Sequence, residues 1–318
     1  MFPGGSIRGV RPVKSSTRMR VLAASVACGT AAVLATLSPQ ATAEEPTGKT
    51  LVVIGDSFSA NGQILDLLNS SGDTGCKHVS TSWPTQLTQR LALPPDDVED
   101  TSCQGGSIDT SGWTLAHQVK RAMSDGALGP RTHTVTIQLG MNDAWGLDTP
   151  IPLSRAFPCL TDLLNGCGPE AIDQGRAPDP ETITAQTYAT RIRQAVDYIR
   201  YYAPNAHITL IGYPELHTPG QTTACATILG LNITQPRASA ITEYLDHLDT
   251  AQRQAATLLN LDFLDTRALT TGHGPCTPTP WLDGALDPHT ELLGFPWHPS
   301  AQGDSVVATA MQQRITQR

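Results

Sequence analysis

The feature that most constrains the fold is an alternation along the chain between short apolar runs and longer segments of helical periodicity. Five apolar runs with the length of a buried strand lie at residues 50–54, 97–101, 134–139, 208–211 and 261–264. Helical patterns lie at residues 83–91, 115–123, 182–202, 237–259 and 301–315. Strands that alternate with helices predict a parallel sheet covered on both faces. We therefore expect one three-layer α/β/α domain with a central sheet of about five strands.

Polar residues follow the first apolar run, at the place where such folds carry their sites. Ligands bind beyond the carboxyl ends of parallel strands, so reactive side chains are sought directly after each run. Ser57 stands there in the segment Gly55-Asp56-Ser57, where the glycine permits a tight turn from strand to helix. A nucleophile and an ordinary helix cap fit this segment equally well.

Three further segments narrow this choice. After the second run comes CQGGS, in which the backbone N–H of Gly105 can approach a substrate carbonyl because no side chain intervenes. After the third run comes GMND, in which the amide of Asn142 can donate a hydrogen bond to a developing oxyanion. His298 stands directly before the last helical pattern. Together with Ser57, these residues suggest nucleophilic catalysis.

These four segments, in this order from Gly55 to His298, resemble the SGNH hydrolase family, also called the GDSL esterases and lipases. The resemblance implies the flavodoxin-like α/β/α fold of the SGNH hydrolases and hydrolysis of carboxylic esters through an acyl-enzyme on Ser57. It implies His298 as the general base. It also implies an oxyanion hole made by the backbone N–H groups of Ser57 and Gly105 and by the amide of Asn142. Neither a cofactor nor a metal is expected.

One position departs from the family pattern. Three residues before the histidine the family usually has aspartate, and here Phe295 takes its place. A histidine base needs an acceptor at its Nδ1–H that fixes the tautomer of the ring. Some family members use a backbone carbonyl, so we expect the Phe295 carbonyl to orient His298. The alternative is a carboxylate from the preceding loop, and the candidates are Asp283, Asp287 and Glu291.

Other conspicuous residues receive structural interpretations. Asp56 and Asp143 are expected to accept hydrogen bonds from backbone N–H groups of their own turns. The remaining histidines have no metal-ligand spacing and are expected to be structural or exposed. Three tryptophans are candidates either for the wall of an acyl pocket or for ordinary packing: Trp145, Trp281 and Trp297.

The first 43 residues have the form of a signal peptide. Five basic and no acidic residues accompany an apolar run at 21–37, which is followed by Ala-Thr-Ala before Glu44. We predict cleavage after Ala43, secretion, and a catalytic domain at 44–318. The run contains polar residues and falls short of the roughly twenty apolar residues of a membrane span, so an anchor is less favoured. Lipid attachment at Cys28 is also less favoured, because Ser25 precedes it where an aliphatic residue is usual.

The charge of the remaining chain limits its partners. The 21 Lys and Arg of the full sequence include five in the predicted signal peptide, which leaves 16 against 29 Asp and Glu, a net charge of −13. Nucleic acid and anionic membranes are poor partners for such a surface. We expect a monomer that acts on a small-molecule or lipid acyl ester.

Six cysteines remain after residue 43, an even number that is typical of disulfides in an exported chain. Six thiols permit 15 connectivities. Sequential pairing encloses the shortest loops, so the expected bridges are Cys76–Cys103, Cys159–Cys167 and Cys225–Cys276. A zinc site is less favoured because no C-x-x-C pair is present.

Three functions remain open at this point. The first is a secreted esterase or lipase, the second a carbohydrate deacetylase or acyltransferase on the same scaffold, and the third an inactive binding module, which only the missing aspartate supports. The first two differ in the shape of the substrate pocket, which we expect to depend on loops at 144–180 and 213–236. The first of these loops is long enough to overhang the site.

Overall fold

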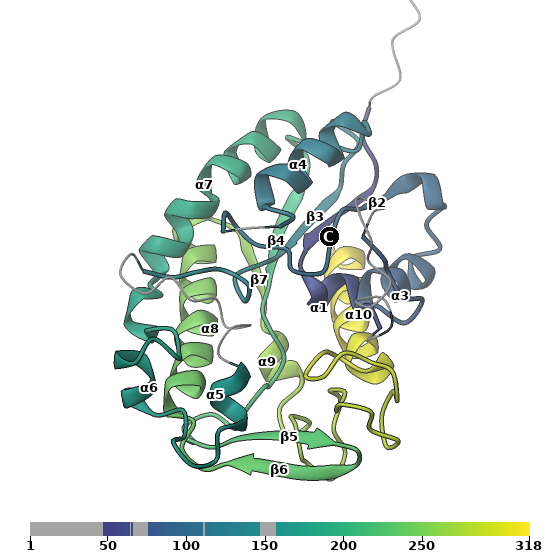
Figure 1. Ribbon diagram of the computed structural model, residues 1–318. Helices are drawn as coiled ribbons and strands as arrows, with labels where there is room; N and C mark the ends of the chain where they lie inside the picture. Colours follow the sequence, from purple (N-terminus) through teal and green to yellow (C-terminus); the bar gives the residue numbers. More distant parts are fainter. Residues whose placement is uncertain (1–46, 64, 66–75, 111, 147–156) are drawn as a thin grey trace, which may run out of the picture. The chain divides into compact units, whose positions relative to one another are not determined.

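The computed structural model describes residues 47–63, 65, 76–110, 112–146 and 157–318 of the chain (Figure 1). The predicted signal peptide and Cys28 therefore lie outside the described residues. No helix of the described part has the length and apolar character that a membrane crossing requires.

A parallel sheet of five strands forms the centre of the domain (Figure 1). Its strand order is β2-β1-β3-β4-β7, and each neighbouring pair is parallel. The strands are β1 (Leu51–Gly55), β2 (Val98–Asp100), β3 (Thr134–Gln138), β4 (His207–Ile211) and β7 (Asp262–Leu264). Each falls within or beside one of the five apolar runs, so the predicted sheet is confirmed.

Helices cover both faces of this sheet, as predicted. Val52 and Ile54 pack with α4 (Leu115–Ser124), α7 (Ala185–Tyr202) and α8 (Ser239–Leu259) in one core. Leu51 and Val53 point to the opposite face, since successive side chains of a strand alternate, and pack with α3 (Trp83–Arg90) and α10 (Ala301–Thr316). The result is a three-layer α/β/α architecture.

The start of α7 differs from the apolar pattern, whereas the end of α8 agrees with it. The pattern predicts a helix from residue 182, but α7 begins at Ala185. The reason is that Thr184 caps it by accepting a hydrogen bond from the backbone N–H of Thr187, while Pro180–Thr182 form a separate 3₁₀ turn. At the C-terminal end of α8, Asn260 adopts a left-handed conformation that stops the helix after Leu259.

The two segments expected as loops contain elements that the sequence analysis missed. Residues 213–236 include an antiparallel hairpin of β5 (Ala224–Ile228) and β6 (Leu231–Gln235). The described part of 144–180 includes α5 (Phe157–Thr161) and α6 (Pro169–Asp173), while residues 147–156 lie outside the described residues. The short helix α9 (Thr266–Leu269) was also missed, whereas α1 (Ser57–Ala60) begins where a turn from strand to helix was expected. These elements are too short to give a clear period, and the hairpin turn is Leu-Gly rather than the usual Asn-Gly.

The described residues contain three disulfides: Cys76–Cys103, Cys159–Cys167 and Cys225–Cys276. They are the three pairs that sequential pairing predicts. The third connects β5 of the hairpin to the loop that precedes His298. It therefore fixes the missed hairpin to the part of the chain that carries the histidine.

Candidate active site

Ser57 and His298 meet at the carboxyl end of the sheet. Ser57 is the first residue of α1 and follows β1 directly after Asp56, whereas His298 lies in the loop before α10. The two residues are 241 positions apart in the chain, and their Nε2 and Oγ atoms are 2.7 Å apart. This is the geometry of a hydroxyl hydrogen-bonded to its general base.

The carbonyl at the other ring nitrogen belongs to Pro296, which corrects the expected role of Phe295. Nδ1 of His298 lies 3.0 Å from the carbonyl oxygen of Pro296. The carbonyl of Phe295 instead accepts the backbone N–H of His298. The loop makes a tight turn here, and Trp297 adopts a positive φ of 64°. This turn moves the acceptor one residue closer to the histidine than the family offset suggests.

The three loop carboxylates that were alternatives for this role have other partners. Asp283 accepts a hydrogen bond from the backbone N–H of Glu291. Asp287 contacts the imidazole of His289, and Glu291 accepts the backbone N–H of Ala301. None of them makes a hydrogen bond or ion pair with the His298 ring in the described structure. The ring is thus oriented by a neutral carbonyl.

An apolar environment surrounds the imidazole. The ring of Phe58 stacks on that of His298 at 4.4 Å, and the ring of Phe295 lies at 5.2 Å. Burial disfavours the charged imidazolium and lowers the pKa of His298 to about 4. At neutral pH the ring is uncharged, so Nε2 is free to accept the proton of Ser57.

Hydrogen-bond donors gather beside the serine. Asn142 donates from Nδ2 to the carbonyl of Gly106 at 3.0 Å, which uses one of its two N–H groups and leaves the second for a ligand. Gly106 packs so closely against β1 that an added Cβ would lie 2.6 Å from the carbonyl oxygen of Gly55. The segment that carries Gly105 is therefore adjacent to the strand end that carries Ser57.

Gly105 and Gly106 have different reasons to be glycine. Gly105 adopts a φ of +72°, which favours glycine, but a Cβ at this position would meet no protein atom. Gly106, by contrast, lies against β1, so the two glycines differ in their surroundings. The approach of a substrate carbonyl to the N–H of Gly105 stays a prediction.

The turn below the serine is held by a buried carboxyl. Asp56 accepts a hydrogen bond from the backbone N–H of Phe58 at 2.9 Å and one from the hydroxyl of Tyr213 at 2.5 Å. Burial raises the pKa of Asp56 to about 7. In the loop after β3, Asp143 accepts the backbone N–H of Ile108 and also contacts Arg191. Asp56 thus has the predicted role in its own turn, whereas the backbone donors of Asp143 belong to the segment at Ile108 and Asp109 and not to its own loop. Each aspartate also has a side-chain partner far away in the chain.

Gln118 of α4 is a positioning residue that the sequence did not indicate. Its Oε1 accepts the N–H of Gly55 at 2.8 Å, and its Nε2 donates to the carbonyl of Gly55 at 2.9 Å. The pairing of β1 with β2 ends at Val53, so Gln118 satisfies backbone groups that β2 no longer reaches. No local pattern marks a buried glutamine on an amphipathic helix.

A second missed contact joins the serine and histidine segments. Asn61, at the end of α1, donates from Nδ2 to the carbonyl of Pro299 at 2.7 Å and to the carboxyl of Asp304 at 2.6 Å. Asp304 is fully buried in α10, directly after the histidine loop. This contact fixes α1 relative to the residue that follows His298.

A cavity of about 410 Å³ opens beside Ser57 and His298. Its wall is mainly apolar and includes Met141, Leu216 and Leu245, with Leu160 from α5. Ala224 and Cys225 of the hairpin also contribute. Thus elements from both segments that were expected to shape the pocket line it.

Of the three candidate tryptophans, one lines the cavity and two do not. Trp297 lines the cavity and donates from Nε1 to the carbonyl of Cys225 at 3.1 Å. Trp145 is buried against Tyr188 and is not part of the cavity wall. Trp281 stacks on His273. Only Trp297 of the three therefore has the pocket position that was considered.

No group of three or more potential metal ligands gathers within the described residues. His217 also lines the cavity, but its ring contacts Arg267 and lies 3.2 Å from the carboxyl of Asp246. These contacts agree with the structural role expected for this histidine.

Comparison with known proteins gives a consistent result. Residues 53–306 match the GDSL-like Lipase/Acylhydrolase family. Lipase 1 of Streptomyces coelicolor is 30% identical over 254 residues, which cover 80% of this chain and 82% of that protein. The Esterase of Streptomyces scabiei is 26% identical over an alignment that covers 93% of this chain and 94% of that protein.

Two solved structures share the fold. The extracellular lipase of Streptomyces rimosus superposes with a TM-score of 0.55 and 22% identity, over 83% of this chain and all of that one. Phospholipase A1 of Streptomyces albidoflavus superposes with a TM-score of 0.56 and 22% identity, over 84% of this chain and 99% of that one. At this identity the likeness establishes the architecture alone.

Proposed function

This chain belongs to the GDSL-like lipase/acylhydrolase family and is a carboxylic-ester hydrolase, and from this premise we propose that it acts through an acyl-enzyme on Ser57. The observation that carries the proposal is the 2.7 Å contact between Ser57 Oγ and His298 Nε2 at the wall of an apolar cavity. Inactive binding would not require this pair beside the donors of Asn142 and the Gly105 segment.

The reaction proceeds in two steps. In the first, Nε2 of His298 removes the proton of Ser57 while Oγ attacks the ester carbonyl carbon, and the carbonyl oxygen becomes an oxyanion. The N–H groups of Ser57 and Gly105 and the amide of Asn142 stabilise this oxyanion. Collapse expels the alcohol, which takes the proton from His298. In the second step water, deprotonated by His298, releases the carboxylic acid and restores Ser57.

The Pro296 carbonyl holds the Nδ1–H of His298 throughout this sequence. It fixes the tautomer that leaves Nε2 unprotonated, which is one of the tasks of the aspartate in a triad. It carries no charge, so it stabilises the transient imidazolium less than a carboxylate would. The proposed machinery is therefore a Ser–His dyad with a backbone acceptor.

The cavity wall supports an apolar acyl group as the part of the substrate that enters the site. Leucine, methionine and aromatic side chains offer few hydrogen bonds to the hydroxyls of a sugar. The observation thus favours esters of fatty acids over acetylated carbohydrates. A series of p-nitrophenyl esters of increasing chain length, compared with acetylated xylan, tests this preference, and faster turnover of the xylan ester would reject it.

The test of the nucleophile is the replacement Ser57→Ala. We expect it to abolish hydrolysis of p-nitrophenyl butyrate and labelling by an organophosphonate, because both need the Ser57 oxygen, while the thermal unfolding temperature stays near that of the parent protein. Activity within tenfold of the parent would exclude Ser57 as the nucleophile.

Export with removal of residues 1–43 completes the proposal. The three disulfides support an oxidising compartment, and a structural relative is described as an extracellular lipase. N-terminal sequencing of protein collected from the culture medium is expected to begin at Glu44. Protein that stays in the cell with residues 1–43 attached would contradict this part.

A further inference from the structure

One face of the β5–β6 hairpin is apolar except for Gln235, which is buried at the base where it pairs with Ala224. In its register Ile228 pairs with Leu231 and Ala226 with Ile233, so these side chains share a face with Ala224 at the base. Ala224 lines the cavity. At the other end Leu231 is 70% exposed and Leu229, in the turn, 65% exposed. An apolar path therefore runs from the cavity wall to solvent.

The hairpin turn keeps a leucine at a position where the backbone disfavours it. Leu229 and Gly230 have φ values of 51° and 76°, the left-handed pair that a two-residue hairpin turn requires. Asparagine is the usual residue at the first of these positions, and a branched apolar residue there is strained. Folding alone does not explain an exposed leucine at a site where asparagine would fold better.

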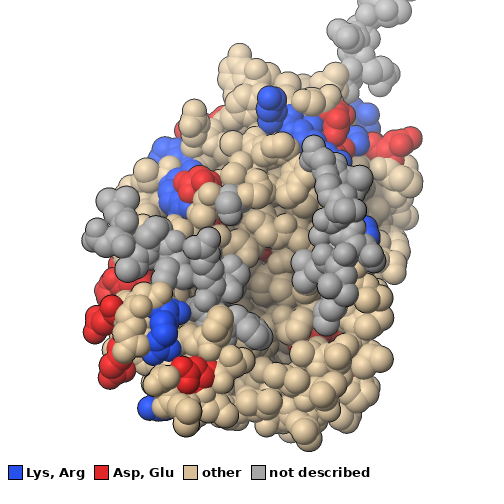
Figure 2. Space-filling view, in the orientation of Figure 1, with Lys and Arg blue, Asp and Glu red and all other residues tan. Residues whose placement is uncertain are grey.

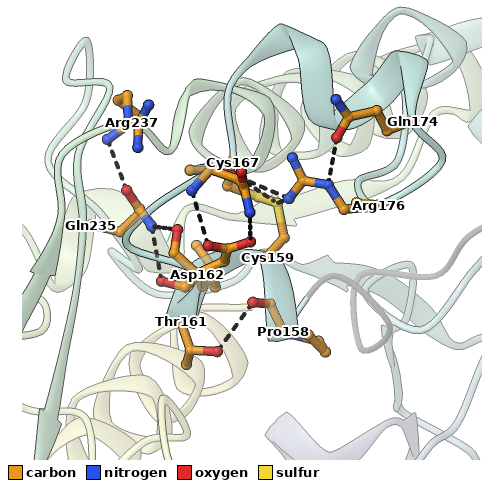
Figure 3. The surroundings of a disulfide bond; sticks show 12 residues. Pro158, Cys159, Thr161, Asp162, Cys167, Gln174, Arg176, Gln235 and Arg237 are labelled. Atoms are coloured by element: carbon orange, nitrogen blue, oxygen red, sulfur yellow. Dashed lines mark hydrogen bonds between the residues drawn. A yellow bond between two sulfur atoms is a disulfide. The ribbon is translucent and has the colours of Figure 1, made fainter.

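A second exposed apolar segment lies at the base of the hairpin, in the Cys159–Cys167 ring (Figure 3). This ring carries Leu163 and Leu164, of which Leu164 is 88% exposed. Its backbone is fixed from the hairpin side: Gln235 donates to the carbonyl of Asp162 at 2.9 Å, and the Arg237 guanidinium donates to the carbonyls of both leucines. The two leucines are thus presented to solvent on a rigid loop.

The charge of this region differs from that of the rest of the chain. No Asp, Glu, Lys or Arg occurs between Glu215 and Arg237, although the chain without residues 1–43 has a net charge of −13. Figure 2 shows a mostly tan surface over the lower part of this face, where Figure 1 places β5 and β6. The hairpin surface is therefore uncharged, although Asp162 and the Arg237 guanidinium lie beside Leu163 and Leu164. An uncharged apolar hairpin suits an uncharged partner, and exposed patches of this kind mark interaction sites.

We propose that this apolar rim, defined as Leu163, Leu164, Leu229, Leu231 and Ile233, docks on the surface of an uncharged lipid aggregate. The inference rests on the proposed function, since the aggregate supplies the acyl ester. The rim adjoins the cavity through Ala224 and through Leu160 of α5, so an acyl chain that leaves the lipid layer reaches Ser57 along apolar side chains. The rim binds the lipid surface and does not include Ser57 or His298.

The double variant Leu229→Asn/Leu231→Thr tests the proposal. Asparagine suits the turn and threonine suits a strand, so we expect an unchanged or higher unfolding temperature. Turnover of emulsified trioctanoin should fall by about tenfold or more, because two leucines no longer leave water on docking. Turnover of monomeric p-nitrophenyl butyrate should stay within about twofold. The matched control is Leu258→Gln, an exposed leucine of α8 about 25 Å along the helix from Ile241 of the cavity wall.

Binding is measured separately from turnover, with Ser57→Ala protein and phosphatidylcholine vesicles in a sedimentation assay. The rim variant, Leu229→Asn/Leu231→Thr on the Ser57→Ala background, should bind these vesicles about tenfold more weakly than Ser57→Ala alone. Ser57→Ala protein should bind phosphatidylglycerol vesicles more weakly than phosphatidylcholine vesicles. The proposal would be overturned if the rim variant bound vesicles as tightly as Ser57→Ala alone, or if its turnover of trioctanoin and of p-nitrophenyl butyrate fell equally. Tighter binding to the anionic vesicles would also overturn it. Retention of butyrate hydrolysis by Ser57→Ala would instead overturn the proposed nucleophile, so the two failures are distinguishable.

Discussion

At the scale of single residues, we expect the protonation of His298, the proposed general base, to control the pH dependence of hydrolysis. Burial lowers its pKa to about 4, and below that value both ring nitrogens carry protons, so Nε2 cannot accept the proton of Ser57. We expect kcat/KM for a soluble ester to hold from pH 7 down to about pH 5 and to decline with a midpoint near 4. The measurement is a pH profile of initial rates. A midpoint near 7, where Asp56 and Asp283 titrate, would assign control to a carboxyl.

The proposed Ser–His dyad also leads to a prediction for the loop carboxylates. Asp283→Asn, Asp287→Asn and Glu291→Gln should each leave kcat within a few-fold of the parent, because a carbonyl rather than a carboxylate contacts the His298 ring. Unfolding temperatures serve as the control, since Asp283 is buried between the histidine loop and Glu291. A loss near 10⁴-fold in a variant that remains folded would identify a third catalytic member.

At the scale of elements, α4 positions the end of β1 through Gln118. Gln118→Leu keeps the side-chain volume but leaves the buried N–H of Gly55 without its acceptor, which typically costs about 1–3 kcal/mol of stability. We expect kcat to fall by about tenfold while KM changes little, because a shift of the strand end moves Ser57 relative to His298. The comparison is Gln312→Leu, which removes an exposed hydrogen bond between α10 and Arg90. If Gln118→Leu and Gln312→Leu changed kcat equally, Gln118 would have no positioning role.

At the scale of the whole molecule, the two disulfides in the segments that line the site constrain the unfolded chain to different degrees. The two cysteines are 51 positions apart in Cys225–Cys276 and only 8 positions apart in Cys159–Cys167. A chain-entropy model gives roughly 4 kcal/mol for the longer loop and roughly 2.5 kcal/mol for the shorter one. Cys225→Ala/Cys276→Ala should therefore destabilise more than Cys159→Ala/Cys167→Ala in urea unfolding. The reverse order would show that local packing around the small ring outweighs the loop closure.

The sequence by itself determined the sheet, the order of its strands along the chain and the segments that carry the site. Buried strands are continuous apolar runs, and the carboxyl ends of parallel strands meet at one edge of the sheet. The sequence therefore predicts that Ser57, Gly105 and Asn142 lie together at this edge. The disulfide pairs followed from their spacing. These features depend on local periodicity and on chain order, which a sequence displays directly.

The tertiary structure alone decided which groups support that site. It selected Pro296 over Phe295 as the acceptor for His298, because a tight turn at Trp297 shifts the loop by one residue. It brought Gln118 to Gly55 across 63 positions of the chain. It also paired two short segments into the hairpin that lines the cavity. Each depends on contacts between residues distant in the chain, whose free energy comes from burial and hydrogen bonding in the folded state and leaves no period in the sequence.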